Sequence, residues 1–343
     1  MIHLFRMHGD RLAFDPQTGA LHTVDETAYQ VLEEYDRAGG VRPAEPVLAD
    51  LAARLGEGVS ACADEVDGLI RERLLFAPAA PVPDLSVLYP DRPRIKSMCL
   101  HAAHDCNLRC RYCFAGTGDY GTGSRCRMDL DTGRKAVDFL IRESGPRRNL
   151  DIDFFGGEPL LNWPVVTALT EYCEKRGAEE GKNIRLTITT NATLLDADKT
   201  EFINRHMKNC VLSLDGRPET HDRMRPDAGG RGSYDKVAAS IRRFVEERGE
   251  REHYVRGTFT RHNLDFSKDV LHIASLGVRQ ISVEPVVAPD GCGYELRAED
   301  LLVIREEYDR LALAYVEARA SGPDRWFNYF HFMIDLDGGP CAY

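Results

Sequence analysis

The sequence predicts an α/β protein in which a small winged-helix-like α+β domain precedes a partial (β/α)6 TIM barrel. Two observations predict this architecture. From residue 97 onward, six strand-like segments alternate with helical ones, a pattern typical of a parallel sheet with helices on its outer face. Before residue 81, a hairpin signal is followed by three helical segments. Six strand–helix units are fewer than the eight of a closed barrel, so we expect an open one.

The first 80 residues are predicted to form strands and then helices. Strand-like residues lie on both sides of the turn signal PQTG, in HLFRMHGDRLAFD and ALHTVD. Asp25 is placed to cap a helix over ETAYQVLEEYDRA, and further helices are expected over PVLADLAARLG and CADEVDGLIRERLL. Prolines recur through residues 81–96. Because proline denies the backbone a hydrogen-bond donor, this segment is predicted to be a linker.

The barrel is predicted over residues 97–320. Its strands are expected in MCLHAAH, LDIDFFG, RLTITT, CVLSLD, YVRGTFT and QISVEPV. Helices are expected to begin near Leu130, Trp163, Asp196, Tyr234 and Phe266, with a last helix from about Ala298 to Arg319. The carboxyl ends of parallel strands meet on one side of a barrel, which is where barrel enzymes hold their reactive groups.

Composition excludes several classes of protein. The net charge is −11, and residues 1–85 hold seven Lys/Arg against fifteen Asp/Glu, a net of −8, so no nucleic-acid partner is expected. No segment approaches the roughly 18 uninterrupted apolar residues of a membrane span. The opening MIHLFRMHGDRLAF lacks the pattern of a secretion signal. Ten cysteines without an export signal predict a reducing, cytoplasmic location and metal chemistry.

Three cysteines lie close together in HDCNLRCRYCFAG, directly after the first barrel strand: Cys106, Cys110 and Cys113. A [4Fe–4S] cluster normally takes four cysteine ligands, so three with no fourth nearby indicate one iron open to another ligand. Zinc would require four tetrahedral ligands, and a disulfide framework is not expected in a reducing compartment. We expect the cations Arg109 and Arg111 to favour ionised thiols.

Polar and glycine residues follow the other strands. Gly156-Gly157-Glu158-Pro159 follows the second, where glycines allow the backbone to approach a ligand, although such a pair is commonly only a turn. Asn191 and Ser213 end the third and fourth strands, and they either bind a ligand or cap helices. Arg225 forms either a carboxylate contact or a surface salt bridge. Glu284, at the end of the sixth strand, either lines a substrate pocket or caps the barrel.

The cysteine spacing, with Tyr112 before the last cysteine, resembles the signature of the radical S-adenosylmethionine (SAM) superfamily, and Gly156–Pro159 resembles its GGEP motif. The resemblance implies a [4Fe–4S] cluster on the three cysteines, with SAM on the open iron and a flavodoxin or ferredoxin as reductant. It further implies SAM contacts from Tyr112 (adenine), from Gly156, Gly157, Glu158 and Pro159 (amino group), and from Asn191, Ser213 and Arg225 (carboxylate and ribose).

The end of the chain, GGPCAY, resembles the beginning of the SPASM/twitch auxiliary-cluster region, with Cys341 as its first ligand. One cysteine cannot hold a cluster. Residues 321–343 are therefore expected to be the start of a truncated SPASM/twitch region, and auxiliary [4Fe–4S] clusters are expected only in a longer form.

The opening segment, the cysteine loop, RGTFTRHNLDF and GGPCAY together resemble the SCIFF-peptide maturases, which form thioether crosslinks in a six-cysteine peptide. Cys126 departs from that pattern. The resemblance implies that residues 1–80 recognise the leader of a Cys-rich precursor peptide. Two alternatives stay open: an anaerobic sulfatase-maturating enzyme, which forms formylglycine, and a non-catalytic peptide-binding protein.

Overall fold

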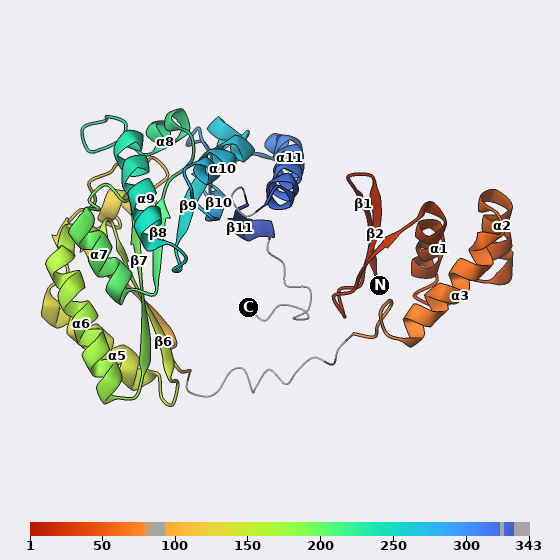
Figure 1. The fold of residues 1–343 in the computed structure, drawn as a ribbon, viewed down its shortest axis with the longest axis horizontal. Coiled ribbons are helices and arrows are strands. Elements are labelled where there is room, and N and C mark those ends of the chain that lie inside the picture. Colours follow the sequence, from red (N-terminus) through yellow and green to blue (C-terminus); the bar gives the residue numbers. More distant parts are fainter. Residues whose placement is uncertain (80, 82–92, 323–325, 333–343) are drawn as a thin grey trace. The chain divides into compact units, whose positions relative to one another are not determined.

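The computed structural model describes residues 1–79, 81, 93–322 and 326–332 (Figure 1). These residues fall into two compact units, one within residues 1–91 and one within residues 92–333. None of the described helices combines the length and the apolar character that a membrane crossing requires.

The N-terminal unit is a three-stranded antiparallel sheet followed by three helices. The strands β1 (His3–Met7), β2 (Asp10–Phe14) and β3 (Leu21–Val24) pair in that order, so β1 and β3 are its edges. The expected first strand is therefore itself a hairpin. It turns at His8 and Gly9, whose φ angles of 52° and 93° are those of a tight hairpin turn. This turn was not expected, because its positive φ angles depend on the pairing of β1 with β2.

The three helices of this unit are α1 (Glu26–Arg37), α2 (Glu45–Leu55) and α3 (Gly58–Arg71). The predicted cap is confirmed, since Asp25 accepts a hydrogen bond of 2.8 Å from the backbone N–H of Ala28. Tyr35 of α1 is fully buried, and its hydroxyl donates to the carbonyl of Ala63 on α3 (2.9 Å). Helix α3 begins four positions earlier than the segment that was expected.

The C-terminal unit is built on an eight-stranded sheet with the order β11-β10-β9-β8-β7-β6-β4-β5. Its strands are β4 (Ser97–His104), β5 (Cys126–Arg127), β6 (Asn149–Gly156), β7 (Asn183–Thr190), β8 (Asn209–Ser213), β9 (Tyr254–Phe259), β10 (Gln280–Pro285) and β11 (Asn328–Tyr329). All six predicted strands are present and parallel. The two outer strands, β5 and β11, do not pair with each other, so the barrel is open, as expected.

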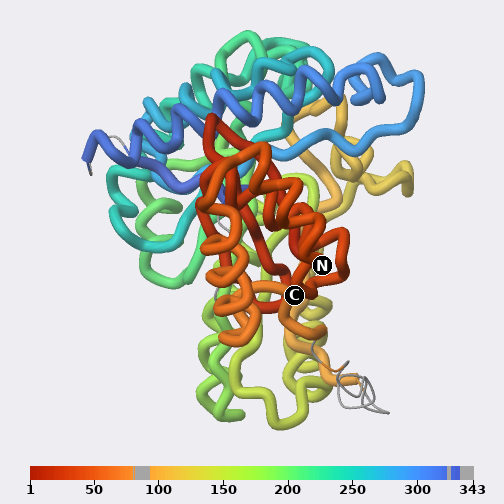
Figure 2. The backbone as a smooth tube through the Cα atoms, turned by 90° about the vertical axis from the view of Figure 1, so that its right-hand side faces the viewer, coloured from red at the N-terminus to blue at the C-terminus, as the bar shows by residue number. Residues whose placement is uncertain are grey.

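The helices of this unit cover one face of the sheet and can be followed along the chain in Figures 1 and 2. They are α5 (Leu130–Glu143), α6 (Trp163–Glu179), α7 (Ala197–His206), α8 (Pro218–Met224), α9 (Tyr234–Arg248), α10 (Phe266–Ser275) and α11 (Leu301–Ala320). The predicted helix starts are confirmed, whereas the short helix α8 was not expected. Alternation along the strands places residues such as Phe154 in the core with the helices, and turns Asp153 and Phe155 to the other face.

A buried arginine connects several backbone segments at the amino-terminal end of the barrel. Arg248 is 2% exposed, and its guanidinium donates to the backbone carbonyls of Ile203, Met207, Lys208 and Glu252 and to the side chain of Asn204. Arg248 therefore provides hydrogen-bond donors for backbone carbonyls at the end of α7, in the segment before β8 and in the segment before β9.

We expect Arg248→Met to lower the free energy of unfolding by about 3 kcal/mol, because it leaves several buried carbonyls without a donor. Urea unfolding of the purified chain measures this effect. Arg243→Met, on the exposed face of the same helix, is the matched control and should change stability by no more than about 0.5 kcal/mol. Equal effects of the two substitutions would contradict the assignment.

Candidate active site

A cavity of about 430 Å³ lies at the carboxyl ends of the barrel strands. It is lined by the three clustered cysteines and by residues that follow five further strands: Cys106, Cys110, Tyr112, Cys113, Phe114, Ala115, Phe155, Gly156, Gly157, Thr189, Thr190, Asn191, Ser213, Arg225, Arg256, Thr258, Glu284, Pro285, Val286 and Val287. Residues separated by up to about 180 positions therefore meet at the one place where a barrel gathers its loops.

The cysteine loop follows β4 and is held by backbone hydrogen bonds. The N–H groups of Arg109 and Arg111 donate to the carbonyls of Pro226 (2.7 Å) and Met224 (2.9 Å). Asp105 accepts a hydrogen bond of 2.9 Å from the N–H of Cys106, which fixes the first turn of the loop. The loop is thus anchored to the end of α8 and to the segment that follows it.

The three cysteines are partly buried. Burial raises the pKa of Cys106 to about 12 and that of Cys110 to about 11, and Arg225 acts against the effect at Cys110. The expectation that Arg109 and Arg111 favour the thiolates is wrong. The Arg109 guanidinium binds the carbonyls of the loop instead, and the Arg111 side chain is exposed. The cation beside the thiols is Arg225, with Nη1 4.0 Å from Cys110 Sγ.

The donor set fits an iron–sulfur cube better than a single ion. No group of three or more His, Cys, Asp or Glu side chains in the described part of the chain could hold one metal ion. A zinc ion needs its sulfur ligands about 2.3 Å from one point, whereas a cube offers each thiolate a separate iron. The buried hydroxyl of Tyr120 has no hydrogen-bond partner in the described structure. Burial raises its pKa to about 12, with smaller contributions from Cys99, Cys113 and Cys106.

The Gly-Gly loop after β6 packs against the cysteine loop, backbone to backbone. The N–H groups of Gly157 and Glu158 donate to the carbonyls of Ala103 and Asp105, each at 2.8 Å. A Cβ atom at Gly156 would lie 2.4 Å from the Ala103 carbonyl oxygen, and one at Gly157 would lie 2.1 Å from that of Asp105. Both positions therefore require glycine for this close approach.

Glu158 and Pro159 do not line the cavity, whereas Gly156 and Gly157 do. The Glu158 carboxylate is fully buried behind the wall, where it accepts hydrogen bonds from the Thr190 hydroxyl (2.7 Å) and the Asn191 N–H (2.8 Å). Burial raises its pKa to about 7, and these hydrogen bonds oppose the rise. The side chain thus joins the loop after β6 to the end of β7.

The residues expected to contact the SAM carboxylate and ribose all line the cavity: Asn191 and Ser213 at strand ends, and Arg225 after α8. The Asn191 amide donates to Asn107 Oδ1 (2.9 Å) and lies 3.6 Å from Cys106 Sγ, so it contacts the cysteine loop directly. The hydroxyl of Tyr112 donates to Asp215, and the Arg225 guanidinium lies 5.3 Å from the centre of the Tyr112 ring.

Glu284 was expected to line a substrate pocket or cap the barrel, and it lines the cavity, whereas Arg256, Phe155 and Val287 line it without having been expected. Arg256 and Glu284 form an ion pair between the neighbouring strands β9 and β10, which form the far wall from the cysteine loop. Arg256 could have been found from the alternation in YVRGTF, which turns it away from the buried Val255. Phe114 also lines the cavity and is 79% exposed, so it forms part of the rim.

Comparison with known proteins shows which proteins this barrel resembles. Residues 102–263 match the model of the Radical SAM superfamily, and this match implies a [4Fe–4S] cluster and SAM as cofactors. The chain is 30% identical over 144 residues to a cysteine-type anaerobic sulfatase-maturating enzyme of Clostridium novyi, with 41% of this chain and 38% of that protein covered. It is 24% identical over 139 residues to the radical SAM cyclopropyl synthase TigE of Paramaledivibacter caminithermalis, with 37% and 29% covered.

A solved structure, native anSMEcpe with bound AdoMet and Kp18Cys peptide, shares the fold with a TM-score of 0.59. It is 21% identical, and the match covers 70% of this chain and 64% of that one. The chain thus spans less than half the length of the two curated relatives and under two thirds of the solved structure.

Proposed function

We propose that this protein is a radical SAM enzyme that installs thioether crosslinks in a Cys-rich, ribosomally made precursor peptide. The observation that carries the proposal is the meeting of the three-cysteine loop, the Gly-Gly loop and the polar strand ends in one cavity. When bound, the cluster supplies the electron that cleaves SAM and yields a 5′-deoxyadenosyl radical, which removes hydrogen from the substrate.

Different residues around the cavity bind the cluster and the different parts of SAM. Cys106, Cys110 and Cys113 hold the cluster and leave one iron open. Gly156 and Gly157 present backbone to the SAM amino group, and Glu158 and Pro159 shape that loop from behind. We assign Asn191, Ser213 and Arg225 to the SAM carboxylate and ribose, and Tyr112 to the adenine side. Apolar walls exclude water from the reacting carbon.

The far wall is our candidate for the substrate side. The Arg256–Glu284 pair offers a donor and an acceptor side by side, and Phe114 and Val287 give the rim an apolar character. An extended peptide carries matching carbonyl and N–H groups along its backbone. The Kp18Cys peptide bound to anSMEcpe, which shares the fold, supports a peptide partner.

We assign leader recognition to residues 1–80, as a winged-helix-like domain. Its sheet has two edge strands, β1 and β3, to which a peptide could add as a further strand, a mode of binding that requires no basic surface. Residues 81–96 would be the linker, 97–320 the barrel and 321–343 the start of the auxiliary-cluster region. Cys341 and most of that last region lie outside the described residues.

Thioether formation joins a cysteine sulfur to a carbon and removes one hydrogen from each. One hydrogen atom leaves with the deoxyadenosyl radical, and the thiol proton goes to solvent. One electron is left over when the substrate carbon radical joins the thiolate sulfur. It requires an acceptor, for which we propose the auxiliary cluster of a longer form. A flavodoxin or ferredoxin supplies the electron that cleaves SAM.

The second candidate is a formylglycine-forming sulfatase maturase, which the identity to the Clostridium novyi enzyme favours. Anaerobically reconstituted protein is incubated with SAM, reductant and either a leader-bearing Cys-rich peptide or a sulfatase-derived peptide. The proposal expects 5′-deoxyadenosine and a Cys-rich peptide that has lost two hydrogens per crosslink and kept its sulfur. The same peptide without its leader is the control and should react poorly.

Conversion of only the sulfatase peptide, with loss of sulfur and gain of an aldehyde, would overturn the thioether assignment. Peptide binding without any deoxyadenosine would instead indicate a non-catalytic peptide-binding protein.

A further inference from the structure

Asp215 lies at the centre of a buried hydrogen-bond network behind the cavity wall. Its side chain is fully buried, two residues after the end of β8. One carboxylate oxygen accepts from Arg225 Nε and from the N–H of Thr258, each at 3.0 Å. The other oxygen accepts from the hydroxyl of Tyr112. One carboxylate therefore joins the cysteine loop, the segment after α8 and strand β9.

This network determines which part of Arg225 faces the cavity. Asp215 occupies Nε, and the Arg225 side chain, 11% exposed, lines the cavity with Nη1 4.0 Å from Cys110 Sγ. The Arg225 backbone is held as well, because its carbonyl accepts a hydrogen bond of 2.6 Å from Ser233. With Nε fixed, the terminal guanidinium nitrogens are the donors that remain for a ligand.

We propose that Asp215 is a positioning residue that aims the terminal nitrogens of Arg225 at the SAM carboxylate and fixes them relative to the cysteine loop through Tyr112. The inference rests on the proposed function of Arg225. It predicts that Asp215 acts by holding Arg225 and Tyr112 in place rather than through its charge. The side-chain amide of Asp215→Asn has the same shape, accepts a hydrogen bond from Arg225 Nε and donates one to the Tyr112 oxygen, and so preserves the arrangement.

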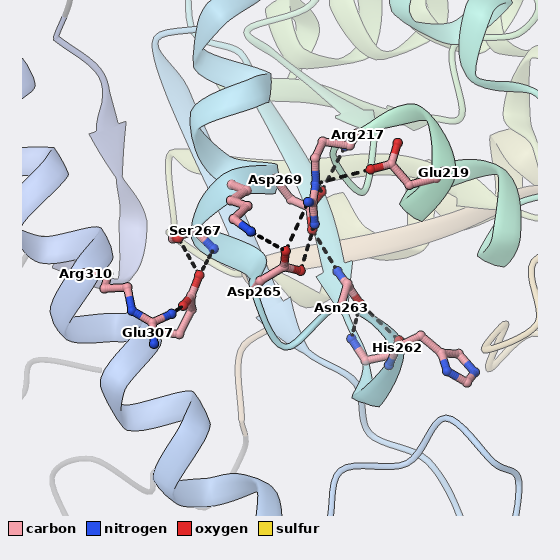
Figure 3. Close-up of polar contacts among 11 residues, drawn as sticks. Arg217, Glu219, His262, Asn263, Asp265, Ser267, Asp269, Glu307 and Arg310 are labelled. Carbon is pink, nitrogen blue, oxygen red and sulfur yellow. Dashed lines mark hydrogen bonds and ion pairs between the residues drawn. The ribbon is translucent and has the colours of Figure 1, made fainter.

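A second buried Asp–Arg pair, between Asp269 of α10 and Arg217 at the start of α8, serves as the matched control (Figure 3). Asp269 is also fully buried and accepts from the Nε (2.8 Å) and the backbone N–H (2.9 Å) of Arg217. Arg217 does not line the main cavity. Loss of Asp269 therefore removes a buried Asp–Arg ion pair without releasing a cavity-facing arginine, and Asp265 still binds Arg217.

The test measures SAM binding, not turnover. Wild type, Asp215→Ala, Asp215→Asn and Asp269→Ala are reconstituted anaerobically, their iron content is determined, and their affinities for SAM and for decarboxylated SAM are measured by equilibrium dialysis. We expect Asp215→Ala to weaken SAM binding by about tenfold to a hundredfold, as for the loss of a charge-assisted hydrogen bond. Affinity for decarboxylated SAM should change by less than about twofold in the same variant, because that ligand lacks the carboxylate.

Asp215→Asn should restore most of the SAM affinity, and Asp269→Ala should retain it. The inference is overturned if Asp215→Ala binds SAM as wild type does, if both ligands lose affinity equally, or if Asp269→Ala shows the same loss. Should Asp215→Ala retain less iron, Asp215→Ser replaces it, since serine keeps a hydroxyl in this buried space but lacks the carboxylate that binds Arg225. Failure of the wild type itself to bind SAM would count against the proposed function, whereas a change confined to the variants tests Asp215 alone.

Discussion

Replacing any one of Cys106, Cys110 or Cys113 with alanine should abolish cluster binding and SAM cleavage. The three thiols lie in one loop, and the described residues offer no alternative group of metal ligands. A cube held by only two thiolates has lost half of its usual protein ligands. We expect iron to fall from about four per cluster site to below one, and 5′-deoxyadenosine to fall to background. Iron analysis, the visible spectrum and chromatography of the reaction measure the three quantities.

Cys62→Ala is the control for this series. Cys62 is a half-buried thiol of the N-terminal unit, where it packs beside the core, and burial raises its pKa to about 11. This variant should keep its barrel cluster and its SAM cleavage. Full iron content in any of the three loop variants would contradict the ligand assignment.

Gly157→Ala should damage the site almost as severely, through the backbone. The added Cβ would lie 2.1 Å from the carbonyl oxygen and 2.5 Å from the carbonyl carbon of Asp105, the residue before Cys106. Neither contact can be relieved by rotating a side chain, so the cysteine loop itself must move. We expect a loss of about 3 kcal/mol or more in the free energy of unfolding, together with loss of most of the iron.

Gly121→Ala separates this clash from an ordinary glycine substitution. Gly121 belongs to the same loop region, has a φ of +75°, and has no atom within 4 Å of the added Cβ. It should lose about 1 kcal/mol through backbone strain and keep its cluster. If Gly157→Ala loses no more stability and iron than Gly121→Ala, the close approach of the two loops is not what holds the site together.

The strands and helices of the barrel were predictable because each carries a local signal. Buried alternation in LDIDFFG predicted β6, and capping residues such as Asp25 and Asp196 predicted where helices begin. Strands β5 and β11 have two residues each, too few for any period to be detected. The turn at His8–Gly9 was missed for a different reason, since its positive φ angles depend on the pairing of β1 with β2.

The candidate site was predictable where a motif fixes its chemistry within a few residues. The cysteine spacing and the Gly-Gly pair are of this kind, and their residues line one cavity. Contacts between distant segments were not predictable. Sequence proximity suggested Arg109 and Arg111 as the cations beside the thiols, whereas Arg225, over a hundred positions away, takes that place. Likewise, only the fold turns Glu158 away from the cavity and toward Thr190.

The central claim is that three thiolates hold an iron–sulfur cube whose fourth iron binds SAM. The most direct test is electron paramagnetic resonance of the reduced, anaerobically reconstituted protein, recorded with and without SAM. The account predicts the signal of a reduced [4Fe–4S] cluster that changes when SAM is added and that is absent from the Cys106→Ala, Cys110→Ala and Cys113→Ala variants. A cluster signal that SAM leaves unchanged, or one that survives those substitutions, would contradict it.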